Sequence, residues 1–130
     1  MKKQLLLIAA IFPMLLLAQS VSIIPQPVSL QVGQGSFVID NNTTIKTITG
    51  NGDLRRAADL FSDYIKSVSG KTLPLNAKKA KAIELRLAKT EGIGKEGYLL
   101  TVSPSFVKLT ANTKAGISYG LQTLFQSIPV

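Results

Sequence analysis

The chain of 130 residues contains no cysteine, no histidine and no tryptophan. Without cysteine, disulfide bonds, thiolate zinc sites and cysteine nucleophiles are all excluded. Without histidine, the commonest general base and the commonest metal ligand are absent. Aromatic residues make up only 6% of the chain, so few rings are available for a flat sugar-binding platform. These absences exclude most familiar catalytic and metal-binding sites.

Acidic residues are also few, seven against fifteen lysines and arginines. One pair, Asp59 and Asp63, lies one helical turn apart, a spacing suited to acid–base chemistry or to cation binding. Arg55, Arg56 and Lys66 fall on the same predicted helix face, opposite the apolar one. We therefore interpret the pair as solvent-facing helix charges. No catalytic residue, metal ligand or cofactor is predicted.

What is present begins with an N-terminal leader. Lys2 and Lys3 form a positive start, Leu5–Leu17 form an apolar run, and the small residues Ala18 and Ser20 allow cleavage after either. The run is short for a membrane span. We expect residues 1–20 to be a signal peptide and the protein to be exported, periplasmic or extracellular, with no membrane span after cleavage.

The positive charge of the mature chain is scattered. Without the two leader lysines, the formal charge falls from +8 to +6. A basic domain can bind nucleic acid, but the one cluster, Lys78, Lys79 and Lys81, lies in a predicted loop without aromatic or arginine-rich interleaving. We interpret it as a solvated loop and expect no nucleic-acid partner; a basic nucleic-acid binder is the weakest hypothesis.

Alternation of apolar and polar residues predicts several strands. Residues 28–32 and 37–39 alternate on either side of a Gly33–Gly35 turn and are expected to pair as a hairpin. Residues 43–48 are β-branched and predict a further short strand. Residues 83–87 alternate cleanly. A second hairpin is expected from residues 98–102 and 107–111, which flank Ser103–Ser105.

The first predicted helix follows the strand at 43–48. Asp53 is placed to cap its start and Gly70 to end it. Charged residues fall on one face and apolar residues on the other. The expected core face consists of Leu54, Ala57, Ala58, Phe61, Tyr64, Ile65 and Val68.

A second helix is predicted near the end of the chain, within Ala111–Val130. Thr113 is placed to cap it and Pro129 ends it. Gly116 and Gly120 lie one turn apart, where small residues let a backbone approach its neighbour closely. The apolar stripe consists of Ile117, Leu121, Leu124, Phe125 and Ile128.

Three residues of this second helix lie away from its apolar stripe. They are Tyr119, Gln122 and Gln126, and Tyr119 is the one ring expected outside the core, since Tyr64 and Tyr98 follow the inward pattern. We predict that the three residues form a domain-docking face. Strands that alternate and helices with one apolar face predict an α+β fold: a two-layer sandwich, with a mostly antiparallel sheet and two helices packed on one face.

Three stretches of the chain resemble the N-terminal, non-catalytic domain of bacterial family 20 glycoside hydrolases, the β-N-acetylhexosaminidases. They are IIPQPVSLQVGQGSFVI at Ile23–Ile39, AADLFSDYI at Ala57–Ile65 and EGYLLTVSPSFVKLTANTKAGISYGLQTLFQSIP at Glu96–Pro129. Strand hairpin, connecting residues and helix come in the family's order in the last stretch. The resemblance covers nearly all of residues 21–130.

The resemblance implies a small α+β module that packs against a catalytic (β/α)₈ barrel. The catalytic Asp–Glu pair, the substrate-orienting arginine and the sugar-stacking tryptophans of the family belong to that barrel, and none has a matching position here. Residues 21–130 are thus expected to be the accessory domain of an exported β-N-acetylhexosaminidase, an enzyme that removes terminal N-acetylhexosamine residues by substrate-assisted hydrolysis. The barrel is absent, so the chain is expected to be a fragment that meets amino-sugar glycans only through its missing partner.

Two alternatives stay open. In the first, the chain is the accessory domain of a related exo-glycosidase, of the O-linked N-acetylglucosaminidase or α-glucuronidase type, because similar modules precede different barrels. In the second, it is a free-standing module that binds amino sugars.

Overall fold

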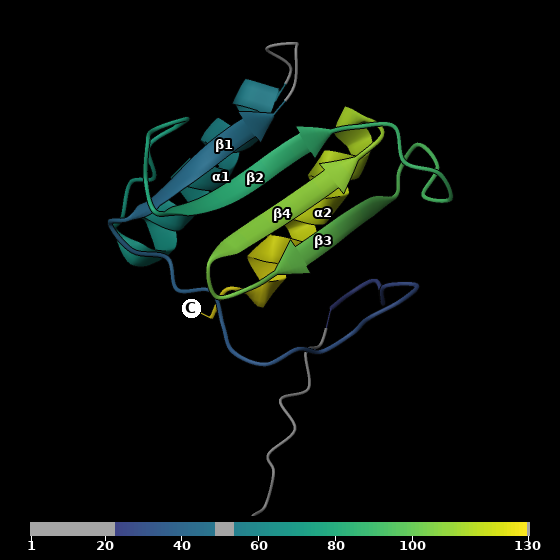
Figure 1. The fold of residues 1–130 in the computed structure, drawn as a ribbon, viewed down its shortest axis with the longest axis horizontal. Helices are drawn as coiled ribbons and strands as arrows, with labels where there is room; N and C mark the ends of the chain where they lie inside the picture. The colour runs from purple at the N-terminus through teal and green to yellow at the C-terminus, as the bar shows by residue number, and fades with distance from the viewer. Residues whose placement is uncertain (1–22, 49–53, 130) are drawn as a thin grey trace, which may run out of the picture.

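The computed structural model describes residues 23–48 and 54–129. One sheet forms the first layer, and both helices lie against the same face of it (Figure 1). This arrangement confirms the predicted two-layer α+β fold. In chain order the elements are β1 (Thr43–Ile48), α1 (Arg55–Ser69), β2 (Lys81–Leu87), β3 (Tyr98–Val102), β4 (Phe106–Ala111) and α2 (Lys114–Ser127).

The sheet is mixed, with strand order β1-β2-β4-β3. β3 and β4 pair antiparallel, whereas β1 with β2 and β2 with β4 pair parallel. The expectation of antiparallel pairing therefore holds for the hairpin and not for the two pairings of β2. The reason is the crossover: α1 returns the chain along the length of the sheet, so β2 starts at the same end as β1. β3 takes the far edge, and the hairpin turn brings β4 in beside β2.

α1 buries the face that its sequence predicts. Ala58, Phe61 and Ile65 are each 1% exposed, and Gly70 ends the helix with a positive φ of 70° and an N–H that donates to the Lys66 carbonyl. Glycine adopts this left-handed conformation without steric cost. The predicted cap Asp53 lies outside the described residues.

α2 begins and ends as expected. The Thr113 side chain accepts a hydrogen bond from the Gly116 N–H at 3.4 Å, and the helix ends at Ser127, two residues before Pro129. Gly120 is buried, and a Cβ placed on it would overlap the side chain of Leu109 in β4. The predicted close approach of the helix backbone to its neighbour is thus confirmed.

The core lies between the sheet and the helices. Phe61 and Phe125 stack with ring centroids 5.8 Å apart, and the Tyr64 ring lies 4.4 Å from that of Phe125. The Tyr64 hydroxyl donates to the Phe125 carbonyl, and the Tyr98 hydroxyl hydrogen-bonds to Thr123 at 2.5 Å. Both tyrosines therefore point inward as predicted, with their polar ends satisfied. The sheet contributes mainly Ile45, Ile83, Leu85, Val107 and Leu109.

The hairpin predicted at residues 28–32 and 37–39 is wrong. The structure describes residues 23–40 as extended or bent chain without a strand, and Val28, Leu30 and Val32 are 109%, 51% and 68% exposed. Alternation describes a chain that could pair, but a two-stranded hairpin is only marginally stable unless one of its faces packs on a core. Here the alternating side chains of residues 28–32 are exposed and lack that packing.

Candidate docking surface

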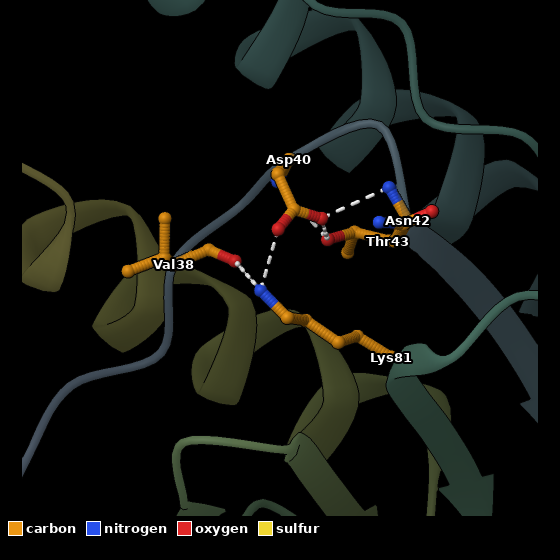
Figure 2. Close-up of polar contacts among 5 residues, drawn as sticks. All are labelled: Val38, Asp40, Asn42, Thr43 and Lys81. Atoms are coloured by element: carbon orange, nitrogen blue, oxygen red, sulfur yellow. Dashed lines mark hydrogen bonds and ion pairs between the residues drawn. The ribbon is translucent and has the colours of Figure 1, made fainter.

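The shortest ion pair of the described chain joins the N-terminal segment, residues 23–40, to the start of β2. Figure 2 shows the Lys81 ammonium between two acceptors, the Asp40 carboxylate at 2.6 Å and the Val38 carbonyl at 3.1 Å. The other carboxylate oxygen of Asp40 accepts from the Asn42 N–H at 2.9 Å and from the Thr43 hydroxyl at 3.2 Å. The prediction that Lys81 lies in a loop is wrong, since it is the first residue of β2.

The contacts of Asp40 with Lys81, Asn42 and Thr43 are of a kind that stabilises a fold, and they do not suit Asp40 to acid–base chemistry. The hydrogen bond from Lys81 holds the pKa of Asp40 below its ordinary value, and the Asn42 N–H lowers it further. A carboxylate whose pKa is lowered stays ionised at neutral pH and cannot act as a general acid there. Through its ion pair with Lys81, Asp40 therefore holds the end of the N-terminal segment against the start of β2.

The remaining acidic residues are dispersed. Asp59 pairs with Arg55 at 3.7 Å, and both side chains are more than half exposed; Asp63 is exposed on the same helix. This places Asp59 and Asp63 on the solvent side of α1, as the sequence predicts. Among residues 23–48 and 54–129, no group of three or more Asp, Glu, His or Cys side chains is arranged to hold a metal ion.

The three predicted docking residues lie along the outer side of α2. Tyr119 is 51% exposed, and Gln122 and Gln126 are exposed as well. Gln126 is engaged: its side-chain oxygen accepts from the Ile24 N–H and its side-chain nitrogen donates to the Ile24 carbonyl, both at 2.9 Å. The N-terminal segment thus occupies the end of this face, while Tyr119 and Gln122 remain open.

A shallow groove of about 210 Å³ runs beside this face, between the start of α1 and the start of α2. Leu60, 57% exposed, is its most accessible apolar side chain. Leu60 was not predicted as a docking residue, although a leucine placed off the apolar stripe of α1 is a signal for an exposed contact. The groove is lined by Leu54, Arg56, Ala57, Leu60, Lys114, Ile117 and Ser118.

The N-terminal segment also exposes apolar side chains that the strand prediction placed partly inward. Five of its large apolar side chains are more than half exposed: Ile24, Val28, Leu30, Val32 and Val38. Apolar side chains scattered over the surface are usual in folded domains, so these five are not assigned to a contact surface. No helix within the described ranges is long and apolar enough to cross a membrane.

Comparison with known proteins assigns this fold. Residues 20–130 match the sequence pattern of glycosyl hydrolase family 20, domain 2. A beta-hexosaminidase from Porphyromonas gingivalis is 27% identical over 114 residues, and a beta-N-acetylhexosaminidase from Cellulomonas fimi is 28% identical over 111 residues. The solved structure of the GH20 beta-N-acetylhexosaminidase from Streptomyces coelicolor A3(2) superposes with a TM-score of 0.75 at 34% identity.

These relatives are much longer than the chain. The matched region covers 85% of this chain and 14% of the Porphyromonas protein, and 83% of this chain and 22% of the Cellulomonas protein. For the Streptomyces coelicolor structure, the corresponding shares are 82% and 21%. The chain therefore spans less than a quarter of the length of each of these proteins.

Proposed function

The chain belongs to glycosyl hydrolase family 20 as its domain 2, and from this premise we propose that it is the supporting domain of an exported β-N-acetylhexosaminidase. In this role it performs no hydrolysis. It packs against a catalytic barrel, a separate domain in family 20 enzymes, and the barrel binds and cleaves terminal N-acetylhexosamine residues.

One observation carries the proposal: domain 2 of the family matches residues 20–130, and the described part of this domain shows no arrangement of groups that could catalyse hydrolysis. Hydrolysis of a glycoside needs groups that donate and accept protons at the scissile bond. In the described part of the chain, the carboxylates either pair with cations, as Asp40 and Asp59 do, or stand alone. The chemistry is therefore assigned to the partner domain.

The proposed contact with the barrel is the outer side of the helical layer. Tyr119 supplies a large half-exposed ring, Gln122 supplies amide donors and acceptors, and Leu60 opens an apolar groove beside them. Interfaces between domains of one chain combine apolar and polar groups in this way. The predicted docking face is thereby extended to α1.

Export is part of the proposal and rests on the leader. The positive start, the apolar run and the small residues at Ala18 and Ser20 support removal of the leader during secretion. Expression in a bacterial host followed by mass spectrometry of the periplasmic product tests it. The expected mature chain starts at Gln19 or Val21, and an intact Met1 on the periplasmic product would contradict export by cleavage.

The absence of catalysis is tested directly. Purified residues 21–130 are incubated with an aryl N-acetylglucosaminide, and release of the aryl group is followed by absorbance. We expect no turnover above buffer. Turnover that purifies with the domain would overturn the assignment.

Sequencing of the DNA beyond the codon for Val130 tests the fragment hypothesis, which expects a reading frame or a frameshifted frame that encodes a barrel.

The docking role is tested in a chimera. Residues 21–130 replace the matching region of the Cellulomonas fimi relative, and activity and thermal inactivation are measured. We expect Tyr119→Asp to lower the inactivation temperature, because it places a charge in the contact. Thr72→Asp adds the same charge at an exposed loop residue and is expected to have little effect. Equal loss in both variants would contradict docking through Tyr119.

The alternatives predict different binding. The family 20 match and the hexosaminidase relatives favour this family over the related exo-glycosidases. A free-standing amino-sugar module would release heat on titration with chitin oligosaccharides, whereas a supporting domain gives none. A basic nucleic-acid binder would show DNA affinity that falls steeply with salt.

A further inference from the structure

The two edges of the sheet differ in how their backbone groups are satisfied. At the outer edge of β1, the Ile45 N–H donates to the Pro74 carbonyl, the Asn76 N–H donates to the Ile45 carbonyl, and the Thr47 N–H donates to the Asn76 side chain. At the outer edge of β3, the described residues provide no such backbone partner. β1 is therefore a closed edge and β3 is an open one.

The hairpin turn fixes which groups of β3 point outward. The Ser103 N–H donates to the Phe106 carbonyl at 2.9 Å, which makes this the first hydrogen-bonded pair of the ladder. Hydrogen-bonded and non-hydrogen-bonded pairs alternate along an antiparallel ladder. In the observed register, Thr101 and Leu99 then bond to β4. The backbone N–H and C=O groups of Tyr98, Leu100 and Val102 consequently point away from the sheet.

β3 also lacks the features that usually protect an open edge. Its sequence, YLLTV, contains no charge and no proline, whereas natural edge strands commonly carry lysine, proline or a bulge. Leu99 is 49% exposed and Val102 is 51% exposed. The N-terminal segment reaches the turn beyond β3, where a Cβ on Gly35 would meet the Pro104 ring, and no backbone hydrogen bond joins residues 23–40 to β3.

We propose that β3 is the contact through which two copies of this domain associate, by antiparallel pairing of one β3 with the β3 of a second copy. With the two-fold axis at Leu100, the outward groups of Leu100 face their own copies, and those of Tyr98 face those of Val102. Each of these pairs exchanges two hydrogen bonds. The interface is self-complementary, as a two-fold contact requires, and no like charges meet in it.

The same register pairs the side chains. Leu99 comes to lie opposite Thr101 on the open face of the sheet, and Tyr98 opposite Val102 on the helical side. The two four-stranded sheets then form one continuous sheet. A contact of five residues from each copy is small, so the dimer is weak and forms at high protein concentration. This inference concerns a different surface from the docking role on α2, and neither depends on the other.

The experiment is sedimentation of residues 21–130, which include every described element of the fold. Concentrations from about 10 µM to about 1 mM bracket the weak association expected of so small an interface. We expect the mass to rise from monomer towards dimer. Val102→Lys and Leu99→Lys, which place charges at the edge, are expected to keep the chain monomeric. Leu60→Lys makes the same change at an exposed leucine on α1 and is expected to leave dimerisation unchanged.

Amide hydrogen exchange by NMR supplies a second readout with residue resolution. The amides of Tyr98, Leu100 and Val102 are expected to become more protected as concentration rises, whereas those of Leu99 and Thr101 are protected at every concentration by β4. Circular dichroism confirms that each variant is folded. A monomer throughout the range, a dimer indifferent to both edge variants, or alternate-residue protection that does not change with concentration would each overturn the proposal.

Discussion

At the scale of single residues, the packing of α2 on the sheet depends on two positions that are occupied by glycine. Gly116 and Gly120 are buried one turn apart, and a Cβ on either would overlap neighbouring atoms, the Gly97 carbonyl in one case and Leu109 in the other. The helix axis therefore lies closer to β4 than any larger residue permits. The Leu109 side chain, fully buried, fills the space that the glycine leaves.

Gly120→Ala is expected to destabilise the domain despite the better helix propensity of alanine. Alanine would gain about 1 kcal/mol in a helix interior, but overpacking against a buried side chain costs about 1–3 kcal/mol, and here several atoms of Leu109 are overlapped. We expect the free energy of unfolding to fall by up to about 2 kcal/mol in urea denaturation. Gly33→Ala, at a position with no atom within 4 Å, serves as the control. A stabilised Gly120→Ala variant would contradict the close packing.

Asp40 gives the domain a predicted sensitivity to acid. Because the hydrogen bond from Lys81 lowers the pKa of Asp40 in the folded state, the pair stabilises the fold above the ordinary aspartate pKa of about 4. This contribution is lost as pH falls through the lowered folded-state pKa. Asp40→Asn is therefore expected to melt at a lower temperature at pH 7 and to lose less stability on acidification than the native chain.

Thermal melting followed by circular dichroism between about pH 7 and about pH 2 measures this difference, since the range starts above the ordinary aspartate pKa and extends well below it. Asp63→Asn removes an exposed carboxylate from α1 and is the matched control. Parallel pH profiles for the native chain and Asp40→Asn would show that the pair does not stabilise the fold.

At the scale of elements, the N-terminal segment is held by hydrogen bonds at both ends, and Phe37 and Ile39 pack against the core beside the second of these anchors. Gln126 binds the backbone of Ile24 on both its N–H and its C=O, and Lys81 binds Asp40 and the Val38 carbonyl. Between these anchors, the described segment forms no backbone ladder. The C-terminal turn of α2 thus has a second role besides core packing, since it positions a part of the chain about a hundred residues earlier.

Gln126→Ala is expected to release the first residues of this segment. Loss of both hydrogen bonds to Ile24 removes the polar contacts at the start of residues 24–37 and leaves the burial of Ile23 to hold this end. Limited proteolysis followed by mass spectrometry is expected to show faster cleavage there, while α1 and the sheet stay intact. Gln122→Ala, one turn earlier on the same helix, is the control. Equal cleavage rates in the two variants would contradict the anchoring role of Gln126.

The sequence correctly predicts those elements whose periodicity and end residues all lie within one short stretch of chain. Both helices, the strand at 83–87 and the hairpin at 98–111 carry their own periodicity and turn residues, and Thr113 and Gly70 mark ends that the structure confirms. The strand pattern at residues 28–32 fails because a hairpin also needs a core to pack against, which local alternation does not reveal. The pairing order of the sheet is also a non-local property, which is why the parallel contacts of β2 were not anticipated.

The candidate site follows the same division. Exposure of Tyr119 could be predicted from its place on a helical wheel. The bond between Gln126 and Ile24 could not, because it joins residues 102 positions apart. The groove beside Leu60 needs the relative placement of two helices, which the sequence of neither one contains.

At the scale of the whole molecule, the core is made almost entirely by residues after the N-terminal segment. Its fully packed members run from Ile45 to Leu124, and Ile23, 7% exposed, is the one buried residue of the segment. The domain therefore has a complete hydrophobic layer without residues 23–35. Most side chains of residues 23–35 lie on the surface of the domain and contribute little to the hydrophobic core.

A chain shortened to residues 36–130 is expected to fold cooperatively. It loses the burial of Ile23, which is worth about 1.5–3 kcal/mol for a fully buried side chain, and keeps Phe37 and Ile39 against the core. We expect a single thermal transition at a lower temperature than that of residues 21–130, with far-UV circular dichroism nearly unchanged. A non-cooperative melt would show that the segment is required for the core.

The strand order β1-β2-β4-β3 also divides the domain into two uninterrupted stretches of chain. β1, α1 and β2 form one half, and β3, β4 and α2 form the other, each from neighbouring sequence. Within the sheet the halves meet at one ladder, β2 with β4, and the chain crosses between them once, through residues 88–97. The joining ladder pairs Ala82 with Phe106, 24 positions apart, whereas the β1–β2 ladder inside the first half pairs Thr43 with Lys81, 38 positions apart, so the joining ladder closes the shorter of the two loops. The domain is therefore built as two modules that fit together, and a break in the connecting loop leaves each module continuous.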